Sequence, residues 1–158
     1  MRQELLERII ELLDSHGFIY RLTHHEPTYT SVESARARGE DISIGGKAIV
    51  MKIGETFYLF VLSAALKVNS SALKQHFDEK RIRFATPEEL LEMAGVVPGA
   101  VPPFGKPILP FDIYVDNSIL RNERIAFNAG SLTDSIIMNV SDYLKIGAPK
   151  ILDFSIRG

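Results

Sequence analysis

The chain has 158 residues, a formal net charge of −2, 46% hydrophobic residues and a mean hydropathy of +0.05. This composition excludes a disordered chain, and no apolar run approaches the ~18–20 residues of a membrane span. The lack of cysteine excludes disulfides, thiolate nucleophiles and zinc sites built on cysteine. We expect one domain, residues 1–158, in the cytoplasm, because the charged and periodic N-terminus is unlike a secretion signal.

The first forty residues predict a helix, a strand and a second helix. Residues 2–17 (RQELLERIIELLDSHG) place leucine and isoleucine on one helical face, and residues 18–24 follow as a strand. Residues 30–39 (TSVESARARG) form the second helix, with Thr30 as its N-cap and Glu33 completing a capping box.

Two apolar runs in the middle of the chain, residues 47–53 and 56–63, flank Gly54 and predict a β-hairpin. Their nearly continuous apolarity indicates that the hairpin is buried on both faces. A short helix is expected at residues 69–77, capped by Asn69 or Ser70.

The rest of the chain combines short strands with short helices around one loop, residues 95–110, that is rich in proline and glycine. Regular alternation of strand and helix is missing, which argues against a doubly wound parallel sheet. We therefore expect an α+β fold with a mixed or largely antiparallel sheet. The pattern predicts strands at residues 81–85, 111–117, 124–130, 135–140 and 150–156, and helices at 86–95 and 141–147.

The sequence suggests a phosphate loop and a histidine metal site, but the residues fit neither. IGGKAI invites a phosphate-loop interpretation, but Asp41 stands where the motif needs its first glycine and Ala48 replaces the magnesium-binding hydroxyl. His24 and His25 are neighbours on a predicted strand, so they point to opposite faces and do not share an ion. We therefore expect no catalytic metal.

The proline-rich loop has two interpretations. Between Pro98 and Pro103 the only backbone N–H donors belong to Gly99, Ala100 and Val101. Rigid flanking prolines could direct these amides toward one point, where they would bind an anion or stabilise an oxyanion. The alternative is a rigid connector with Phe104 plugging the core.

Two further segments contain candidate functional residues. Lys47 begins an apolar strand directly after two glycines, where it could present a fixed cation to a phosphate or carbonyl, or could be an ordinary solvated lysine. Residues 127–135 (FNAGSLTDS) gather polar side chains between two apolar strands, which fits either a pocket rim or an ordinary turn.

Together these segments resemble the YbaK/ProX (INS-like) editing domains, which hydrolyse mischarged aminoacyl-tRNA. The resemblance spans nearly the whole chain, and its most specific stretch is KRIRFATPEELLEMAGVVPGAVPPFG, where a Gly-x-x-x-Pro element maps onto residues 99–103. HHEPTYTSVESARARG is similar to the family's early strand, loop and helix, and GGKAIVMK to the strand that carries its functional lysine, here Lys47. AFNAGSLTDSIIMNVSDYL is similar to the late pocket strand and the helix that follows it.

The resemblance implies a compact domain with a barrel-like sheet that hydrolyses the ester between an amino acid and the 3′-terminal adenosine of tRNA. In this substrate-assisted reaction the loop amides orient the ester carbonyl, Lys47 holds the tRNA end and a ribose hydroxyl helps to activate water. The resemblance implies no metal and no organic cofactor. The implied catalytic residues are Lys47, Gly99, Ala100 and Val101. The expected substrate-binding residues are His25, Tyr29, Thr30, Pro103, Asn128, Gly130, Ser131, Asp134 and Ser135.

Asn128 stands where many relatives of the family carry serine or histidine, and Ser135 where one subgroup carries aspartate. These departures leave the amino acid open among alanine, cysteine, serine and other small residues. The length suggests an enzyme acting in trans on the aminoacyl-tRNA 3′ end, as a monomer or homodimer and with a synthetase as a possible partner. The alternatives are a non-catalytic module that binds aminoacyl-tRNA ends, nucleotides or a synthetase, and an unrelated small-molecule hydrolase or interaction domain.

Overall fold

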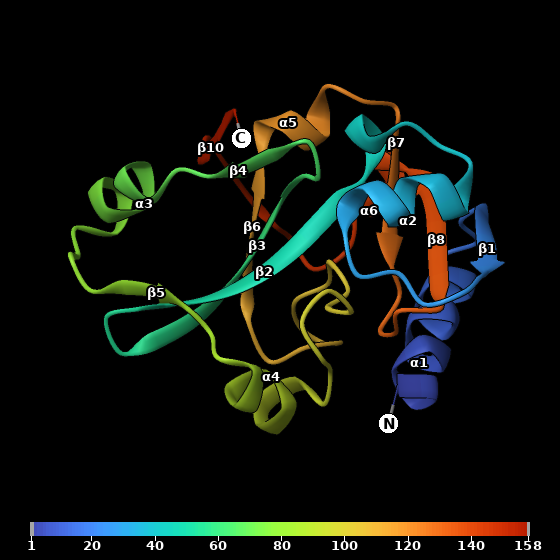
Figure 1. Ribbon diagram of the computed structural model, residues 1–158, viewed down its shortest axis with the longest axis horizontal. Helices are drawn as coiled ribbons and strands as arrows, with labels where there is room; N and C mark the ends of the chain where they lie inside the picture. Colours follow the sequence, from blue (N-terminus) through green and yellow to red (C-terminus); the bar gives the residue numbers. More distant parts are fainter. Residues whose placement is uncertain (1, 158) are drawn as a thin grey trace.

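The computed structural model describes residues 2–157, with side chains from residue 4. Its helices surround the sheets and join their strands, as Figure 1 shows. The helices are α1 (Arg2–Ser15), α2 (Ser31–Arg38), α3 (Ser70–Phe77), α4 (Pro87–Ala94), α5 (Asn117–Leu120) and α6 (Val140–Tyr143), with a 3₁₀ turn, η1, at Ile42–Ile44.

The strands form three sheets. The first has the order β5-β2-β3-β6-β9, the second β1-β8-β7 and the third β10-β4. The strands are β1 (Tyr20–His24), β2 (Gly46–Ile53), β3 (Thr56–Ser63), β4 (Leu66–Val68), β5 (Ile82–Phe84), β6 (Asp112–Asp116), β7 (Arg124–Asn128), β8 (Asp134–Asn139), β9 (Lys150–Leu152) and β10 (Ser155–Arg157).

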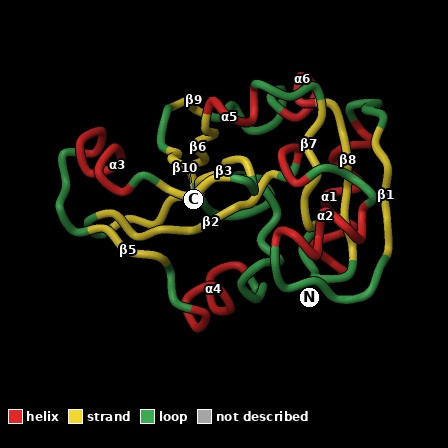
Figure 2. The backbone as a smooth tube through the Cα atoms, turned by 45° about the horizontal axis from the view of Figure 1, so that its top comes forward, coloured by secondary structure: helices red, strands yellow, loops and turns green. Residues whose placement is uncertain are grey.

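The α+β class with a mixed sheet is confirmed. β2 pairs antiparallel with β3 and β5, whereas β6 runs parallel to both β3 and β9. The sheets are at most barrel-like: the second sheet stands beside the first, and the described strands do not close into a barrel (Figure 2).

The β2–β3 hairpin forms as expected, turning at Gly54, whose φ of 61° suits glycine. Its two faces belong to different clusters of the core. Val50 and Leu59 pack into the larger cluster with α1 and the proline-rich loop, whereas Met51 and Phe60 pack into a second, aromatic cluster. Burial of both faces explains why these strands are almost uninterrupted apolar runs.

The start of β2 lies against the second sheet. Gly45 and Ala126 form a parallel β-bridge, and a Cβ on Gly46 would lie 2.5 Å from Cδ1 of Ile125. Glycine is therefore required at residue 46 by close packing. This contact brings Lys47 near the end of β7, where Asn128 stands.

The predicted helix caps are confirmed, with one change. Asn69, Thr30 and Thr86 each accept a hydrogen bond from a backbone N–H in the first turn of their helices. Thr86 also completes a full capping box, but the Glu33 carboxylate accepts from the amide of Tyr29 at 2.8 Å instead of closing a box with Thr30.

The single strand expected at residues 150–156 is wrong, because it is two strands in different sheets. The Phe154 side chain is completely buried and its amide donates to Oδ1 of Asp116 at 2.7 Å. This anchor interrupts the strand, so β9 extends the first sheet and β10 pairs with β4. The sequence pattern also missed β4 and α5, which are only three and four residues long.

The proline-rich loop is an ordered part of the core. Phe104 packs edge-on against Phe127 and Tyr143, and the Tyr143 hydroxyl donates to the Pro103 carbonyl at 2.6 Å. Phe104 therefore plugs the core, as the connector interpretation of the loop described. In the described part of the chain, no helix combines the length and the apolarity needed to cross a membrane.

Candidate functional site

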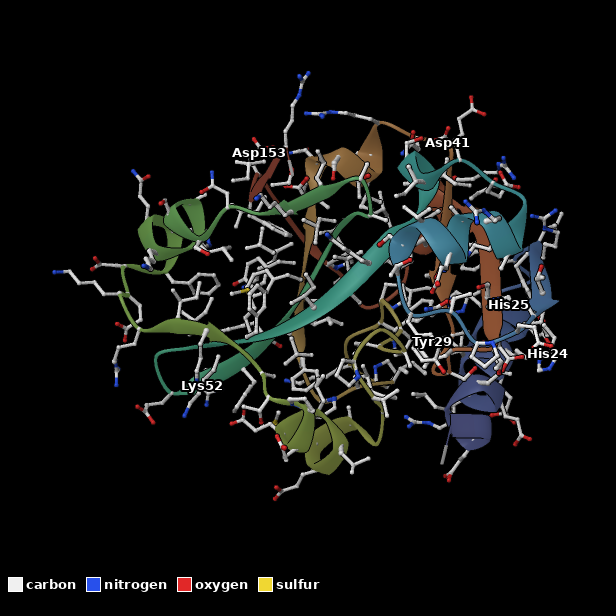
Figure 3. All side chains as sticks on the ribbon, in the orientation of Figure 1. His24, His25, Tyr29, Asp41, Lys52 and Asp153 are labelled. Atoms are coloured by element: carbon white, nitrogen blue, oxygen red, sulfur yellow. The ribbon has the colours of Figure 1, made fainter. Side chains whose placement is uncertain are left out.

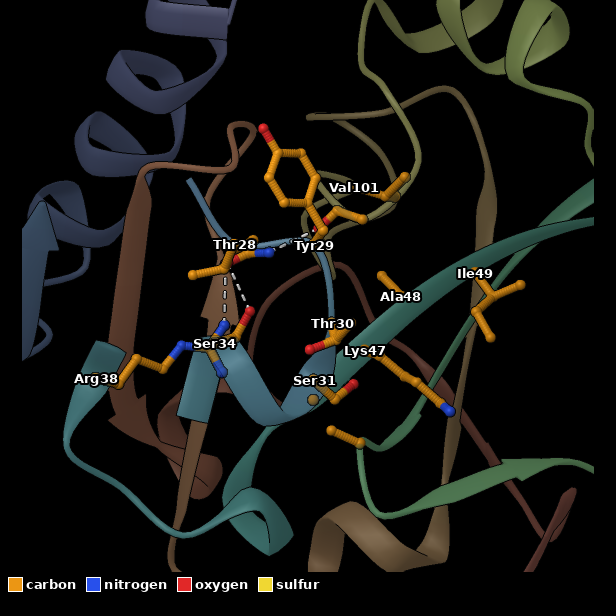
Figure 4. Close-up of a pocket in the computed structure, with 14 residues that line it drawn as sticks. Thr28, Tyr29, Thr30, Ser31, Ser34, Arg38, Lys47, Ala48, Ile49 and Val101 are labelled. Carbon is orange, nitrogen blue, oxygen red and sulfur yellow. Dashed lines mark hydrogen bonds between the residues drawn. The ribbon is translucent and has the colours of Figure 1, made fainter. Parts of the chain in front are cut away.

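A cavity of about 210 Å³ opens between the start of α2, the first half of β2 and the proline-rich loop (Figure 4). It follows the edge of β2 that β5 leaves free, since β5 pairs only with Met51 to Ile53. The lining residues are Thr28, Tyr29, Thr30, Ser31, Ser34, Arg38, Gly46, Lys47, Ala48, Ile49, Ala64, Gly99, Val101 and Asn128.

The cavity brings together about half of the residues that the sequence singled out. Six of the predicted site residues line it: Tyr29, Thr30, Lys47, Gly99, Val101 and Asn128. The others lie behind its wall or away from it: His25, Ala100, Pro103, Gly130, Ser131, Asp134 and Ser135.

The expectation that three consecutive amides converge is wrong for Ala100. Its amide donates to the Val97 carbonyl at 3.1 Å, closing a four-residue turn with Pro98 and Gly99 in the middle. Gly99 has a φ of 88°, as the second central residue of a type II turn requires. Ala100 is fully buried and its amide is occupied by the turn.

Gly99 and Val101 line the cavity, and the turn leaves their amides without a partner in the described part of the chain. Within residues 2–157 neither has an acceptor in hydrogen-bond range. Asn128, which also lines the cavity, holds the turn in place, because its Nδ2 donates to the Gly99 carbonyl at 2.7 Å. A carbonyl or oxyanion in the cavity would find two fixed donors on a rigid loop.

Lys47 lines the cavity from β2 and is half-buried. Partial burial lowers the pKa of its ammonium below the ordinary value. No carboxylate of the described side chains lies within 4.0 Å of it. Its charge is thus available to a ligand.

Arg38 is a second cation of the cavity, and the sequence analysis missed it. Its side chain comes from the last turn of α2 and is only 9% exposed. Nε donates to the Ser135 hydroxyl at 3.0 Å and Nη2 to Oδ1 of Asn128 at 3.1 Å, so both partners are neutral. Burial lowers the pKa of the guanidinium to about 10, which leaves it charged at neutral pH.

A signal for Arg38 does exist in the sequence. Ser34, Ala35 and Arg38 share one face of α2, and all three are buried. Because serine and alanine are small and common on exposed faces too, this face could not be recognised as the inner one without the structure.

His25 and Ser135 form a pair behind the cavity wall. Nε2 of His25 lies 2.8 Å from the Ser135 hydroxyl, and Nδ1 lies 2.8 Å from the carbonyl of Glu26. This is the spacing of a nucleophile and its base. Ser135, however, is fully buried and does not line the cavity, so the pair supports Asn128 and Arg38 rather than attacking a ligand.

The remaining predicted residues have structural partners. A Cβ on Gly130 would lie 3.0 Å from the Leu5 side chain, so this glycine allows α1 to pack closely. Ser131 donates to Asp134 at 2.7 Å, and Asp134 pairs with His24, the exposed histidine that Figure 3 labels beyond His25 at the edge of the molecule.

The comparisons with known proteins agree with this geometry. Residues 25–146 match the model of the aminoacyl-tRNA editing domain. The chain belongs to the aminoacyl-tRNA editing domain family. The matched residues include the whole cavity, and the resemblance seen in the sequence is thereby confirmed.

Relatives of the editing domain include free-standing proteins and parts of larger enzymes. The chain is 34% identical over 154 residues to the multifunctional Ser/Thr-tRNA deacylase ProXp-y of Escherichia coli, covering 94% of this chain and 91% of the relative. It is 31% identical over 117 residues to a proline–tRNA ligase of Shouchella clausii, covering 74% of this chain but 20% of the ligase.

Among solved structures, a candidate trans-editing enzyme for prolyl-tRNA synthetase superposes with a TM-score of 0.83. The sequence identity is 23%, and the alignment covers 96% of this chain and 97% of that one. The likeness establishes the shared fold.

Proposed function

We propose that this protein hydrolyses, in trans, the ester bond that joins a misplaced amino acid to the 3′-terminal adenosine of tRNA. One observation carries the proposal: a single cavity is lined by Lys47, near which no described side chain places a carboxylate, and by Gly99 and Val101, whose amides form no hydrogen bond within the described residues. The deacylase activity in the name of the E. coli relative supports it.

The two amides would bind the ester carbonyl oxygen and stabilise the negative charge that develops on it. Each such donor contributes on the order of 10²–10³ in rate. The attacking oxygen comes from water, and the bond between the acyl carbon and the ribose oxygen breaks. Lys47 would hold the negatively charged end of the tRNA or the ribose oxygens beside the ester.

The proton from water needs an acceptor, and among the described residues no aspartate, glutamate or histidine lines the cavity. The hydroxyls of Thr28 and Ser34, which line the cavity, form a hydrogen bond of 2.7 Å with each other. A hydroxyl of the terminal ribose would orient the water, and the proton of the water would pass to the departing ribose oxygen. The amino acid leaves as the free acid and the tRNA regains its terminal hydroxyl, which makes the reaction substrate-assisted.

The aminoacyl group would occupy the end of the cavity formed by Thr28, Ser34, Arg38 and Asn128. These side chains offer hydroxyl, amide and guanidinium groups in a small volume. A site that hydrogen-bonds a substrate hydroxyl discriminates strongly against analogues without one. Seryl and threonyl esters are the proposed substrates, in agreement with the name of the E. coli relative.

Tyr29 stands at the mouth of the cavity with 74% of its surface exposed (Figure 4). An aromatic ring in this place would stack on the terminal adenine, an interaction that is typically worth ~1–3 kcal/mol. A related domain is part of a proline–tRNA ligase, which supports a synthetase as a partner of this protein.

The test is a panel of tRNAs charged with seryl, threonyl, alanyl, cysteinyl and prolyl groups, incubated with the wild type and with K47A. We expect hydrolysis of the small hydroxylated esters by the wild type and almost none by K47A. Hydrolysis of no ester would contradict the proposal. Binding of the esters without hydrolysis would instead favour a non-catalytic module.

A further inference from the structure

The charged side chains that line the cavity are positive. Its lining contains two cations, Lys47 and Arg38, and no acidic residue among the described side chains. Arg38 is the more unusual of the two, because it is buried and bonded only to the neutral oxygens of Ser135 and Asn128. Burying a cation without a counter-charge is costly, and titratable groups in such surroundings cluster at functional sites.

The acidic groups near Arg38 do not neutralise its positive charge. Glu40, two residues farther along, is committed to Arg21 and Arg124 at 2.9 Å each. Glu33 caps the other end of α2 at the amide of Tyr29, and Asp134 is paired with His24. His25 faces Arg38 only through the Ser135 hydroxyl, and Lys47 adds a second positive charge to the cavity.

An aminoacyl ester carries an α-amino group that titrates near or below pH 8. In its protonated form this group is a cation directly beside the acyl carbon. A cavity of about 210 Å³ places anything bound in it within a few ångströms of Arg38 or Lys47. Like charges at such distances in a partly desolvated site disfavour the charged form.

We infer that Arg38 makes the cavity selective for esters whose α-substituent is uncharged, as a free amine or a hydroxyl, and discriminates against the α-ammonium form. The inference rests on the proposed function and specifies the substrate state that the site accepts. The neutral substituent can still donate a hydrogen bond to the hydroxyl and backbone oxygens of the lining. The selected substrate class therefore includes α-hydroxyacyl-tRNA, in which a hydroxyl replaces the amine.

The wild-type protein tests this directly with two esters of the same acyl chain. Seryl-tRNA and the glyceryl-tRNA obtained from it by nitrous acid deamination differ only in the α-substituent. For each ester, kcat/KM is divided by the spontaneous rate of hydrolysis at the same pH. We expect this normalised value to favour glyceryl-tRNA about tenfold or more near pH 6 and to approach equality near pH 9, where the amine is neutral.

Variants then assign the effect to residue 38. R38M should remove most of the pH dependence of the ratio between the two esters, whereas R38K should retain it because the charge remains. R36M is the matched control: Arg36 belongs to the same helix but is exposed, and the ratio should not change.

The outcomes separate the inference from the proposed function. Preferential hydrolysis of seryl-tRNA near pH 6, or a ratio that does not change with pH, would overturn the inference while the deacylase function stands. Hydrolysis of neither ester would overturn the proposed function, and the inference with it. An equal change in R36M and R38M would show that the effect does not come from the cavity.

Discussion

The cavity beside α2 and a groove beside the β2–β3 turn both contain basic side chains, but only in the groove are arginines paired with acids. In the groove, Arg81 binds Glu79 and Glu55 at 2.8 and 2.9 Å, and Arg83 binds Glu89 at 2.8 Å. In the cavity, Arg38 and Lys47 have no carboxylate within 4.0 Å among the described side chains.

This difference shows which positive charge is available to a ligand. A surface arginine already bound to a carboxylate contributes little to stability and offers little to a phosphate. An unpaired cation in a partly desolvated cavity interacts more strongly with an incoming negative group, because the local dielectric is lower. The presence of basic side chains alone would not have shown that the cavity, rather than the groove, binds the ligand.

The largest expected effect belongs to K47A. Loss of the free ammonium should lower deacylation by about 10²-fold or more, the range seen when one preorganised electrostatic group is removed from an active site. Circular dichroism and the unfolding temperature should stay close to those of the wild type. The measurement is kcat/KM on seryl-tRNA.

K52A is the matched control for K47A. Lys52 belongs to the same strand but lies near the hairpin end, far from Tyr29 and the cavity (Figure 3). Its ammonium lies over the Phe57 ring, and it lines the groove. Equal losses in the two variants would remove the distinction between cavity and groove.

The second largest loss of deacylation is expected for G99V, because this substitution changes the conformation of the turn itself. A β-branched residue at a φ of 88° is strained by ~1–3 kcal/mol, although a Cβ there would meet only Leu132 at an ordinary 3.5 Å. We expect at least a tenfold loss of deacylation with a modest fall in the free energy of unfolding.

G17V separates strain from function in that experiment. Gly17 has a similar φ of 71° at the end of α1, with no atom within 4 Å of an added Cβ. It should lose comparable stability and keep full activity. Full activity in G99V would show that the loop is only a connector.

The sequence predicted most of the fold because local patterns determine it. The hairpin, the caps at Thr30 and Thr86 and the mixed α+β class follow from apolar periodicity and capping residues. The split between β9 and β10 could not be predicted, because it depends on Phe154 entering a distant aromatic cluster and on Asp116 binding its amide.

The site was predictable in part for a related reason. Lys47 and Gly99 are recognisable from their local sequence, but the role of Arg38 depends on Asn128 and Ser135, which lie about 90 residues or more away. The Ala100 error was avoidable, since Pro98-Gly99 is a typical centre of a type II turn, and such a turn binds the amide of the following residue.

A smaller effect is expected when the groove is altered. R83A removes an ion pair on the exposed surface, so deacylation should not change and the unfolding temperature should move little. A loss of activity comparable to that of K47A would indicate that tRNA binds across the groove as well as at the cavity.

The smallest effect concerns acid stability. Hydrogen bonds from Arg81 and Arg83 lower the pKa values of Glu79 and Glu89 from 4.5 to about 2. A carboxylate with a lowered pKa in the folded state stabilises the protein above the unfolded pKa, and this contribution is lost as the pH falls from about 4.5 toward 2. Thermal unfolding of E79Q/E89Q should therefore depend less on pH in this range than that of the wild type.

The most direct measurement is a crystal structure of the protein with seryl-adenosine in which an amide replaces the labile ester. The account predicts the acyl carbonyl oxygen about 2.7–3.1 Å from the amide nitrogen of Gly99 or Val101. Lys47 should lie beside the ribose, and Arg38 beside the seryl group. An analogue bound outside the cavity, or inside it with the carbonyl turned away from both amides, would contradict the account.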